Sequence, residues 1–92
     1  VDDALLKVAA LQAAARLYAD AIASYLRLLV EFKESSIALD KAQFNIGDLY
    51  QYGLNDKPKA ITAYETFLAQ YPQSLLVAQA RKRIRELRGD TL

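Results

Sequence analysis

The chain has 92 residues, 53% of them hydrophobic and 25% charged, which suffices for one small domain with its own core. Its 12 basic and 11 acidic side chains leave a net charge of +1, so the whole chain has no strong attraction to nucleic acid or anionic lipid. No run of 18 apolar residues occurs, and no membrane-spanning segment is expected. Because the chain starts at Val1 without an initiating Met, we expect it to be part of a longer protein.

Apolar residues recur every three or four positions along most of the chain, which predicts helices and no strands. The first helix is expected to open near Asp2 or Asp3, and a second is expected from about Tyr18 to Phe32. A third contains Ile46, Leu49 and Tyr50 and is expected to end at a left-handed cap at Gly53. Asp56 and Pro58 start a fourth helix, and Ser74 and Gly89 bound a fifth.

Two of these helices have similar sequences. AIASYLRLLVEFKES, residues 21–35, returns as AITAYETFLAQYPQS, residues 60–74, at an offset of 39 residues. A fixed offset indicates a structural repeat, in which neighbouring helix pairs bury one another's apolar faces. The aromatic members of these faces are expected to be mostly core residues: Tyr18, Tyr25, Tyr50, Tyr64 and Tyr71.

The second copy resembles a tetratricopeptide repeat. Gln43 takes the large-residue position of the pattern, Ile46 and Gly47 its Leu-Gly pair and Tyr50 its Tyr, while Ala60, Tyr64 and Pro72 take the positions that follow. One extra residue lies in the turn before Ala60. The first copy follows the spacing but has Ala9 in place of Gly, Gln12 in place of Tyr and Lys33 in place of Pro.

This resemblance implies an all-α, antiparallel helix-hairpin solenoid in a single domain over residues 1–92. Two tetratricopeptide repeats, at about 2–35 and 36–73, are followed by a C-terminal capping helix at about 74–88. The tyrosine-proline-x-serine run and the basic, Ala-rich end are similar to bacterial envelope members, namely outer-membrane assembly lipoproteins and the Tol-Pal-associated periplasmic coordinator. A periplasmic or outer-membrane-associated location is therefore expected, with a cytoplasmic one as the alternative.

The side chains used most in catalysis and metal binding are missing. The chain has no His and no Cys, and it contains neither a GxGxxG phosphate loop nor a calcium-binding D-x-D-x-D-G spacing. The carboxylates are scattered over helix starts and faces, where solvation or the helix dipole accounts for them. We therefore expect no enzyme activity, no cofactor and no metal.

In tetratricopeptide arrays the first helix of each repeat faces a concave groove that binds a segment of another protein. The resemblance places one row of this chain in the groove, and we assign partner binding to Lys41, Phe44, Asp48, Gln51, Tyr52 and Lys82. Neighbouring rows would contain Leu6, Ala10 and Ala13 before it and Gln79, Lys82, Arg83 and Glu86 after it. For Phe44 the alternative is packing against the next helix. The Lys and Asn clamp for a chaperone carboxyl terminus is absent, since Asp48 would repel a carboxylate.

Two other functions remain open from the sequence. Two repeats are fewer than a solenoid usually needs, so the chain could self-associate, with Leu11 and Leu76 as apolar residues away from the inner faces. The closing RKRIRELR could bind RNA or an anionic surface, although nucleic acid is the less favoured partner because the domain is not basic overall. The alternative is that these Arg residues have no binding role, because solvation and the helix dipole are enough to explain Arg near the carboxyl end of a helix.

Overall fold

A computed structural model describes residues 2–31 and 39–89. In these ranges the elements are α1 (Asp2–Ala14), α2 (Tyr18–Glu31), α3 (Leu39–Asp48), the π-helical turn η1 (Leu49–Gly53), α4 (Lys57–Gln70) and α5 (Val77–Arg88), with no strand. The predicted all-α fold is confirmed. The expected repeat boundary at residues 35 and 36 and the expected end of the second helix at Phe32 lie outside the described residues.

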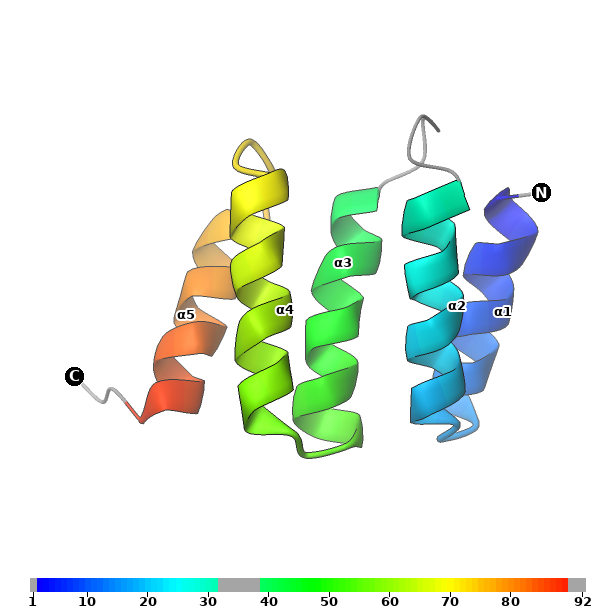
Figure 1. Cartoon of the computed structure of the whole chain (residues 1–92), viewed down its shortest axis with the longest axis horizontal. Coiled ribbons are helices and arrows are strands. Elements are labelled where there is room, and N and C mark those ends of the chain that lie inside the picture. Colours follow the sequence, from blue (N-terminus) through cyan, green and yellow to red (C-terminus); the bar gives the residue numbers. More distant parts are fainter. Residues whose placement is uncertain (1, 32–38, 90–92) are drawn as a thin grey trace.

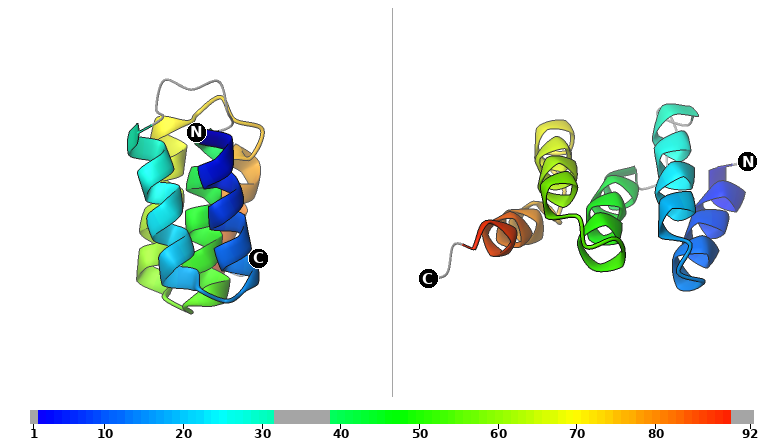
Figure 2. Two further views of the ribbon diagram at one scale, coloured as in Figure 1. Left: turned by 90° about the vertical axis from the view of Figure 1, so that its right-hand side faces the viewer. Right: turned by 60° about the horizontal axis from the view of Figure 1, so that its bottom comes forward.

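The helices stand side by side in chain order, from α1 at one end to α5 at the other (Figure 1). Turned on its side, the array shows two layers, with α2 and α4 in one and α1, α3 and α5 in the other (Figure 2). Its extents of 43 × 29 × 16 Å describe a slab rather than a sphere. This is the helical repeat arrangement that the sequence predicts. None of the described helices has the length and apolar composition needed to cross a membrane.

The apolar faces meet in two buried clusters. The first joins α1, α2 and α3 and contains Ala9, Ile22, Tyr25, Leu28, Leu39, Ala42 and Ile46, with Ala63 of α4. The second joins α3, α4 and α5 and contains Phe44, Ala60, Tyr64, Phe67, Ala80 and Ile84. Tyr50 and Tyr71 pack against both clusters. The core is therefore continuous along the array, and each hairpin covers apolar surface that the next one presents.

Several helix ends follow the predicted chemistry. The Asp56 side chain accepts a hydrogen bond from the Lys59 backbone N–H at 3.2 Å, and Pro58 lies in the first turn of α4. Gly89 ends α5 with φ 76°, in the left-handed region. Ser74 lies in the turn before α5, where its Oγ accepts from the Leu76 N–H at 3.1 Å and donates to Asp40 Oδ2 at 2.6 Å. This serine thus ties the α4–α5 turn to the start of α3.

The expectation of a left-handed cap at Gly53 is wrong. Gly53 belongs to η1, and the positive φ of this turn falls on Asn55 at 54°. Asn tolerates that region better than most residues. The reason for glycine at 53 is close packing, because a Cβ there would lie 2.6 Å from the Tyr18 ring. The turn is wide, with the Leu54 N–H donating to the Leu49 carbonyl at 2.9 Å, and so has room for an extra residue before α4.

Gly47 has the same role between the two helices of the second hairpin. A Cβ at this position would meet Cε1 of Tyr64 at 2.5 Å, well inside van der Waals contact. The Tyr64 side chain is fully buried and cannot move aside. The absence of a side chain at 47 is thus what lets α3 and α4 approach each other at this crossing.

Gly47→Ala tests this contact. In an ordinary helix interior the change would stabilise by about 1 kcal/mol, but here overpacking should destabilise by about 1 to 3 kcal/mol, measured by urea unfolding. Ala23→Gly at an exposed position in the middle of α2 measures the helix-propensity term alone, at about 1 kcal/mol. A Gly47→Ala protein more stable than the parent would show that the Tyr64 ring does not limit this crossing.

Candidate functional site

The layer formed by α1, α3 and α5 carries two hollows. The first, of about 260 Å³, is lined by Ala10, Ala13, Tyr25, Asn45, Asp48 and Leu49. The second, of about 460 Å³, is lined by Tyr52, Ala78, Gln79, Lys82, Arg83 and Glu86. We call the two hollows together the inner groove. Its walls come from α1, α3 and α5, with Tyr25 of α2 and the η1 residues Leu49 and Tyr52.

An ion pair separates the two hollows. Asp48 lines the first hollow, Arg83 lines the second, and Arg83 Nη1 donates to Asp48 Oδ1. Their side chains are only 29% and 17% exposed, so water screens this pair less than a surface pair. Removing either partner would leave a partly buried charge without its counterion.

Tyr64 supports the pair from the core. Its Oη lies 2.5 Å from Asp48 Oδ1 and 3.0 Å from Gln51 Oε1, so its single proton can be donated to either acceptor. The same oxygen accepts a hydrogen bond from Arg83 Nη1 at 3.2 Å. The crossing at Gly47 therefore also fixes the position of the charged side chains in the groove.

Two aromatic rings hold the Arg83 guanidinium. Its central carbon is 5.2 Å from the centroid of the Phe44 ring and 5.4 Å from that of Tyr52, distances typical of cation–π contacts. Phe44 is buried beneath it, whereas Tyr52 is 65% exposed. Arg83 thus holds a large aromatic ring in place at the surface of the second hollow.

Tyr64 and Arg83 keep their protons over the neutral pH range. Burial, followed by the hydrogen bond to Asp48, raises the pKa of Tyr64 well above its usual value near 10. For Arg83, burial alone would lower the pKa, but the charge of Asp48 and the bond to Tyr64 outweigh it and raise the pKa. Both pKa values move away from neutrality, whereas general acid–base catalysis uses groups that titrate near it. The arrangement provides a rigid surface with a fixed pattern of charge.

The residues assigned to partner binding from the sequence are only partly brought together. Tyr52 and Lys82 line the second hollow and Asp48 the first. Gln51 is half-buried beside Tyr64, and Lys41 is exposed on α3 but lines neither hollow. No observation tests whether any of these residues contacts a partner, and their assignment stays a prediction.

The structure favours the alternative for Phe44, which is packing in the core. It is 5% exposed and packs in the second cluster, with its ring centroid 5.4 Å from that of Tyr64 and 5.7 Å from that of Phe67. Of the two interpretations left open by the sequence, packing is the one observed. The reason is Arg83, which covers the side of the ring that would otherwise face the groove.

Sequence reasoning gave too little weight to two residues. Arg83 was placed beside the groove but was not chosen, because its charge was considered together with the basic run of α5. Asn45 was missed, although it lies three positions from Asp48 and so on the same helix face. Its Nδ2 donates to Tyr25 Oη at 3.4 Å, and its amide lines the first hollow.

The remaining cations of α5 lie outside this cluster. Arg81 and Arg85 are exposed, and Arg88 donates to Glu65 Oε2 at 2.7 Å in an exposed ion pair. Pairs of this kind contribute little to stability. Nothing in this arrangement tests binding to RNA or an anionic surface.

A comparison with protein families agrees with the repeat. Residues 41–74, 34 of the 92 in the chain, match the family model described as Tetratricopeptide repeat. The match spans most of α3, all of η1 and α4, and the turn up to Ser74. No curated protein matches the chain. The match supports the tetratricopeptide family and, since such repeats typically bind other proteins without catalysing a reaction, a protein-interaction module in general.

Tyr64→Phe tests the support of the ion pair. It removes one phenolic oxygen and should destabilise the protein by about 0.5 to 1.5 kcal/mol at pH 7. The raised pKa of Tyr64 in the folded state also predicts how this stabilisation depends on pH. It is complete below about pH 10 and is lost as the pH rises above that value, because Tyr64 releases its proton at a lower pH in the unfolded state than in the folded state.

Thermal melts between pH 7 and about pH 11 should therefore show the stability gap between parent and Tyr64→Phe closing at high pH. Tyr52→Phe, which removes an exposed hydroxyl of the second hollow, is the matched control and should leave the parent's profile unchanged. A gap that stays constant to about pH 11 would mean that the Tyr64 pKa is not raised.

Proposed function

We propose that this chain is a noncatalytic interaction module that binds a segment of a partner protein along the inner groove. The observation that carries the proposal is the pair of hollows on one face, divided by the fixed Asp48–Arg83 pair and flanked by the exposed, clamped ring of Tyr52. A rigid aromatic side chain with exposed surface is a typical energetic anchor of protein interfaces.

The two hollows favour different parts of such a segment. The first combines the apolar side chains of Ala10, Ala13 and Leu49 with the polar groups of Tyr25, Asn45 and Asp48, which suits an apolar side chain with a backbone N–H or C=O of the partner beside it. The second carries Lys82 and Glu86, which suits charged or polar side chains. Since the ion pair is already satisfied within the chain, the partner has no need to supply a counterion there.

The location of this module is also a proposal. The run Tyr71-Pro72-Gln73-Ser74 and the basic α5 are the features that support an envelope-type tetratricopeptide protein. Fractionation of cells that express the full-length protein tests this. Recovery with the periplasm or outer membrane is the expected result, and recovery only with the cytosol would favour the alternative.

Tyr52→Ala is the sharpest test of the groove. A partner captured from the native extract and titrated by calorimetry should lose about 1 to 3 kcal/mol of binding free energy. Two controls should change it little: Leu75→Ala removes an even more exposed large side chain that does not line the groove, and Arg88→Ala removes a cation that is paired with Glu65. Loss with either control but not with Tyr52→Ala would place the binding surface elsewhere. Melting curves of each variant separate binding from folding.

Self-association is a second candidate function, favoured by α1. This helix has apolar residues on its outward side as well as its inward side, with Val8 44% and Leu11 70% exposed. Helices that are apolar all round are usually covered on all sides. Leu76, the other residue expected to seed a dimer, instead packs against the second cluster.

Sedimentation across a wide concentration range tests this candidate. The average mass of the parent should rise with protein concentration. Leu11→Glu should abolish this rise, because the desolvation of a charge in an apolar interface costs on the order of several kcal/mol. Leu75→Glu adds the same charge at a 99% exposed position and should leave association unchanged. A parent that stays monomeric at the highest concentration removes self-association as a function.

A further inference from the structure

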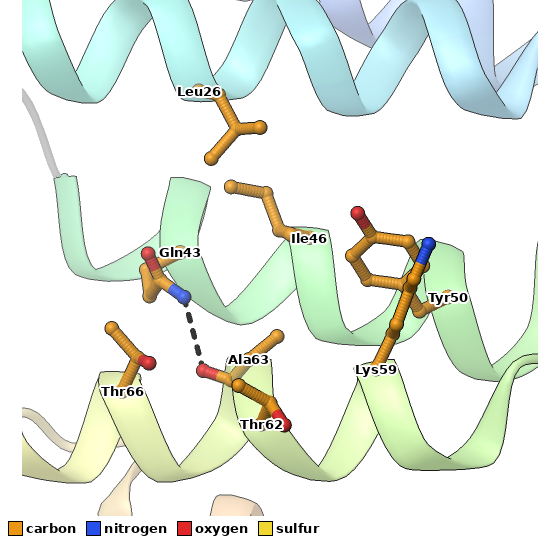
Figure 3. A pocket seen from close by; sticks show the side chains of 8 residues that line it. All are labelled: Leu26, Gln43, Ile46, Tyr50, Lys59, Thr62, Ala63 and Thr66. Carbon is orange, nitrogen blue, oxygen red and sulfur yellow. Dashed lines mark hydrogen bonds between the residues drawn. The ribbon is translucent and has the colours of Figure 1, made fainter.

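A third hollow lies on the opposite side of α3 from the inner groove. It has a volume of about 280 Å³ and runs between α2 and α4, with α3 as its floor (Figure 3). Its apolar part is made by Leu26, Ile46 and Ala63, and Leu26 is 46% exposed at its edge. We call it the outer hollow. The ion pair of Asp48 and Arg83 does not line it, so its occupancy is independent of the proposed function.

A buried amide lies at one end of the outer hollow. Gln43 is 6% exposed, and its Nε2 donates to the Ala63 carbonyl at 3.0 Å. Figure 3 shows the amide oxygen of Gln43 directed away from α4, toward α2. This oxygen can accept a hydrogen bond from an N–H group that enters the hollow. Among the described residues no buried side-chain oxygen or nitrogen lacks a partner, so a ligand that encloses this oxygen has to supply a donor to it.

A cation lies at the other end. Among the described residues, Lys59 is the one charged side chain that lines the outer hollow. Its Nζ stands 5.9 Å from the centroid of the Tyr50 ring, and Figure 3 shows the two side chains together at this end. The charge of the hollow therefore favours an anionic group beside Lys59, with the Tyr50 hydroxyl as a further donor in the same place.

The spacing of the Gln43 amide and the Lys59 cation along α4 indicates what kind of ligand would fit. Ala63, which Gln43 bonds, and Lys59 are four residues apart, or about 6 Å along a helix. An extended peptide advances about 3.3 to 3.6 Å per residue. We propose that the outer hollow binds the free carboxyl terminus of a partner chain that ends in an apolar residue. The carboxylate lies on Lys59, the last side chain fills the space between Leu26, Ile46 and Ala63, and a backbone N–H one or two residues back donates to Gln43.

An acyl-chain carboxylate would meet the apolar walls and Lys59 equally well. It has no N–H, however, and would enclose the Gln43 oxygen without a donor, which carries a desolvation cost. The amide therefore favours a peptide over a fatty acid. An internal peptide segment would meet Gln43 but bring no carboxylate to Lys59.

The test uses fluorescence anisotropy with a fluorescein-labelled hexapeptide ending in Leu. The free acid should bind the 92-residue chain saturably, and the same peptide with an amidated terminus should bind about tenfold more weakly, since a charge-assisted hydrogen bond is lost. Lys59→Gln should weaken the free acid by about the same factor and leave the amide unaffected. Lys57→Gln is the matched control, because Lys57 is exposed in the same turn of α4 but does not line the hollow.

Backbone NMR shifts on titration give the position of binding, with changes expected at residues 26, 46 and 63 of the outer hollow and none at residues 10, 13 and 79 of the inner groove. Tyr52→Ala should leave this titration unchanged, which separates it from the test of the inner groove. The proposal is overturned by no saturable binding up to about 1 mM, by equal binding of acid and amide, or by equal loss with Lys57→Gln. Displacement by octanoate at the affinity of the peptide would assign the hollow to acyl carboxylates instead.

Discussion

The structure depends most on the contact of one tyrosine ring with a helix that has no side chain at that point. Tyr64 lies against Gly47, where a Cβ would be 2.5 Å from the ring, and this sets the distance between α3 and α4. The phenol oxygen then reaches Asp48 and Arg83. The packing of α3 against α4 and the positions of the charged side chains in the groove are therefore coupled, because a change in one displaces the other. Function at this face is linked to the stability of the hairpin.

Much of the fold could be predicted because its determinants are local. The apolar period of α2 and α4, the cap at Asp56 and the left-handed Gly89 each require only a few neighbouring residues. Gly53 was misassigned because glycine serves both turns and close packing, and only the distant Tyr18 distinguishes them. The role of Phe44 could not be predicted for a similar reason. Helix periodicity places it on a face, but whether that face is open depends on Arg83, 39 positions later in the chain.

The candidate site shows the same limit. Tyr52, Lys82 and Asp48 were placed near the groove by repeat alignment, which works because equivalent helices occupy equivalent layers. The pairing of Asp48 with Arg83 depends on how α3 and α5 each pack against α4, and residue types do not encode it directly. The outer hollow is harder still to foresee. It lies between α2 and α4 over α3, so it depends on the spacing of three helices, and its amide is one among many polar residues in the sequence.

The two ends of the array differ in kind. The outward side of α1 carries Val8 and Leu11 with Lys7 beside them, while α5 presents Arg81 and Arg85. Apolar surface laid on α1 would extend the first cluster, whereas apolar surface laid on α5 would have to strip water from cations at considerable cost. Growth by stacking is thus favoured at one end and opposed at the other. The two ends of the described array are therefore unequal as stacking surfaces.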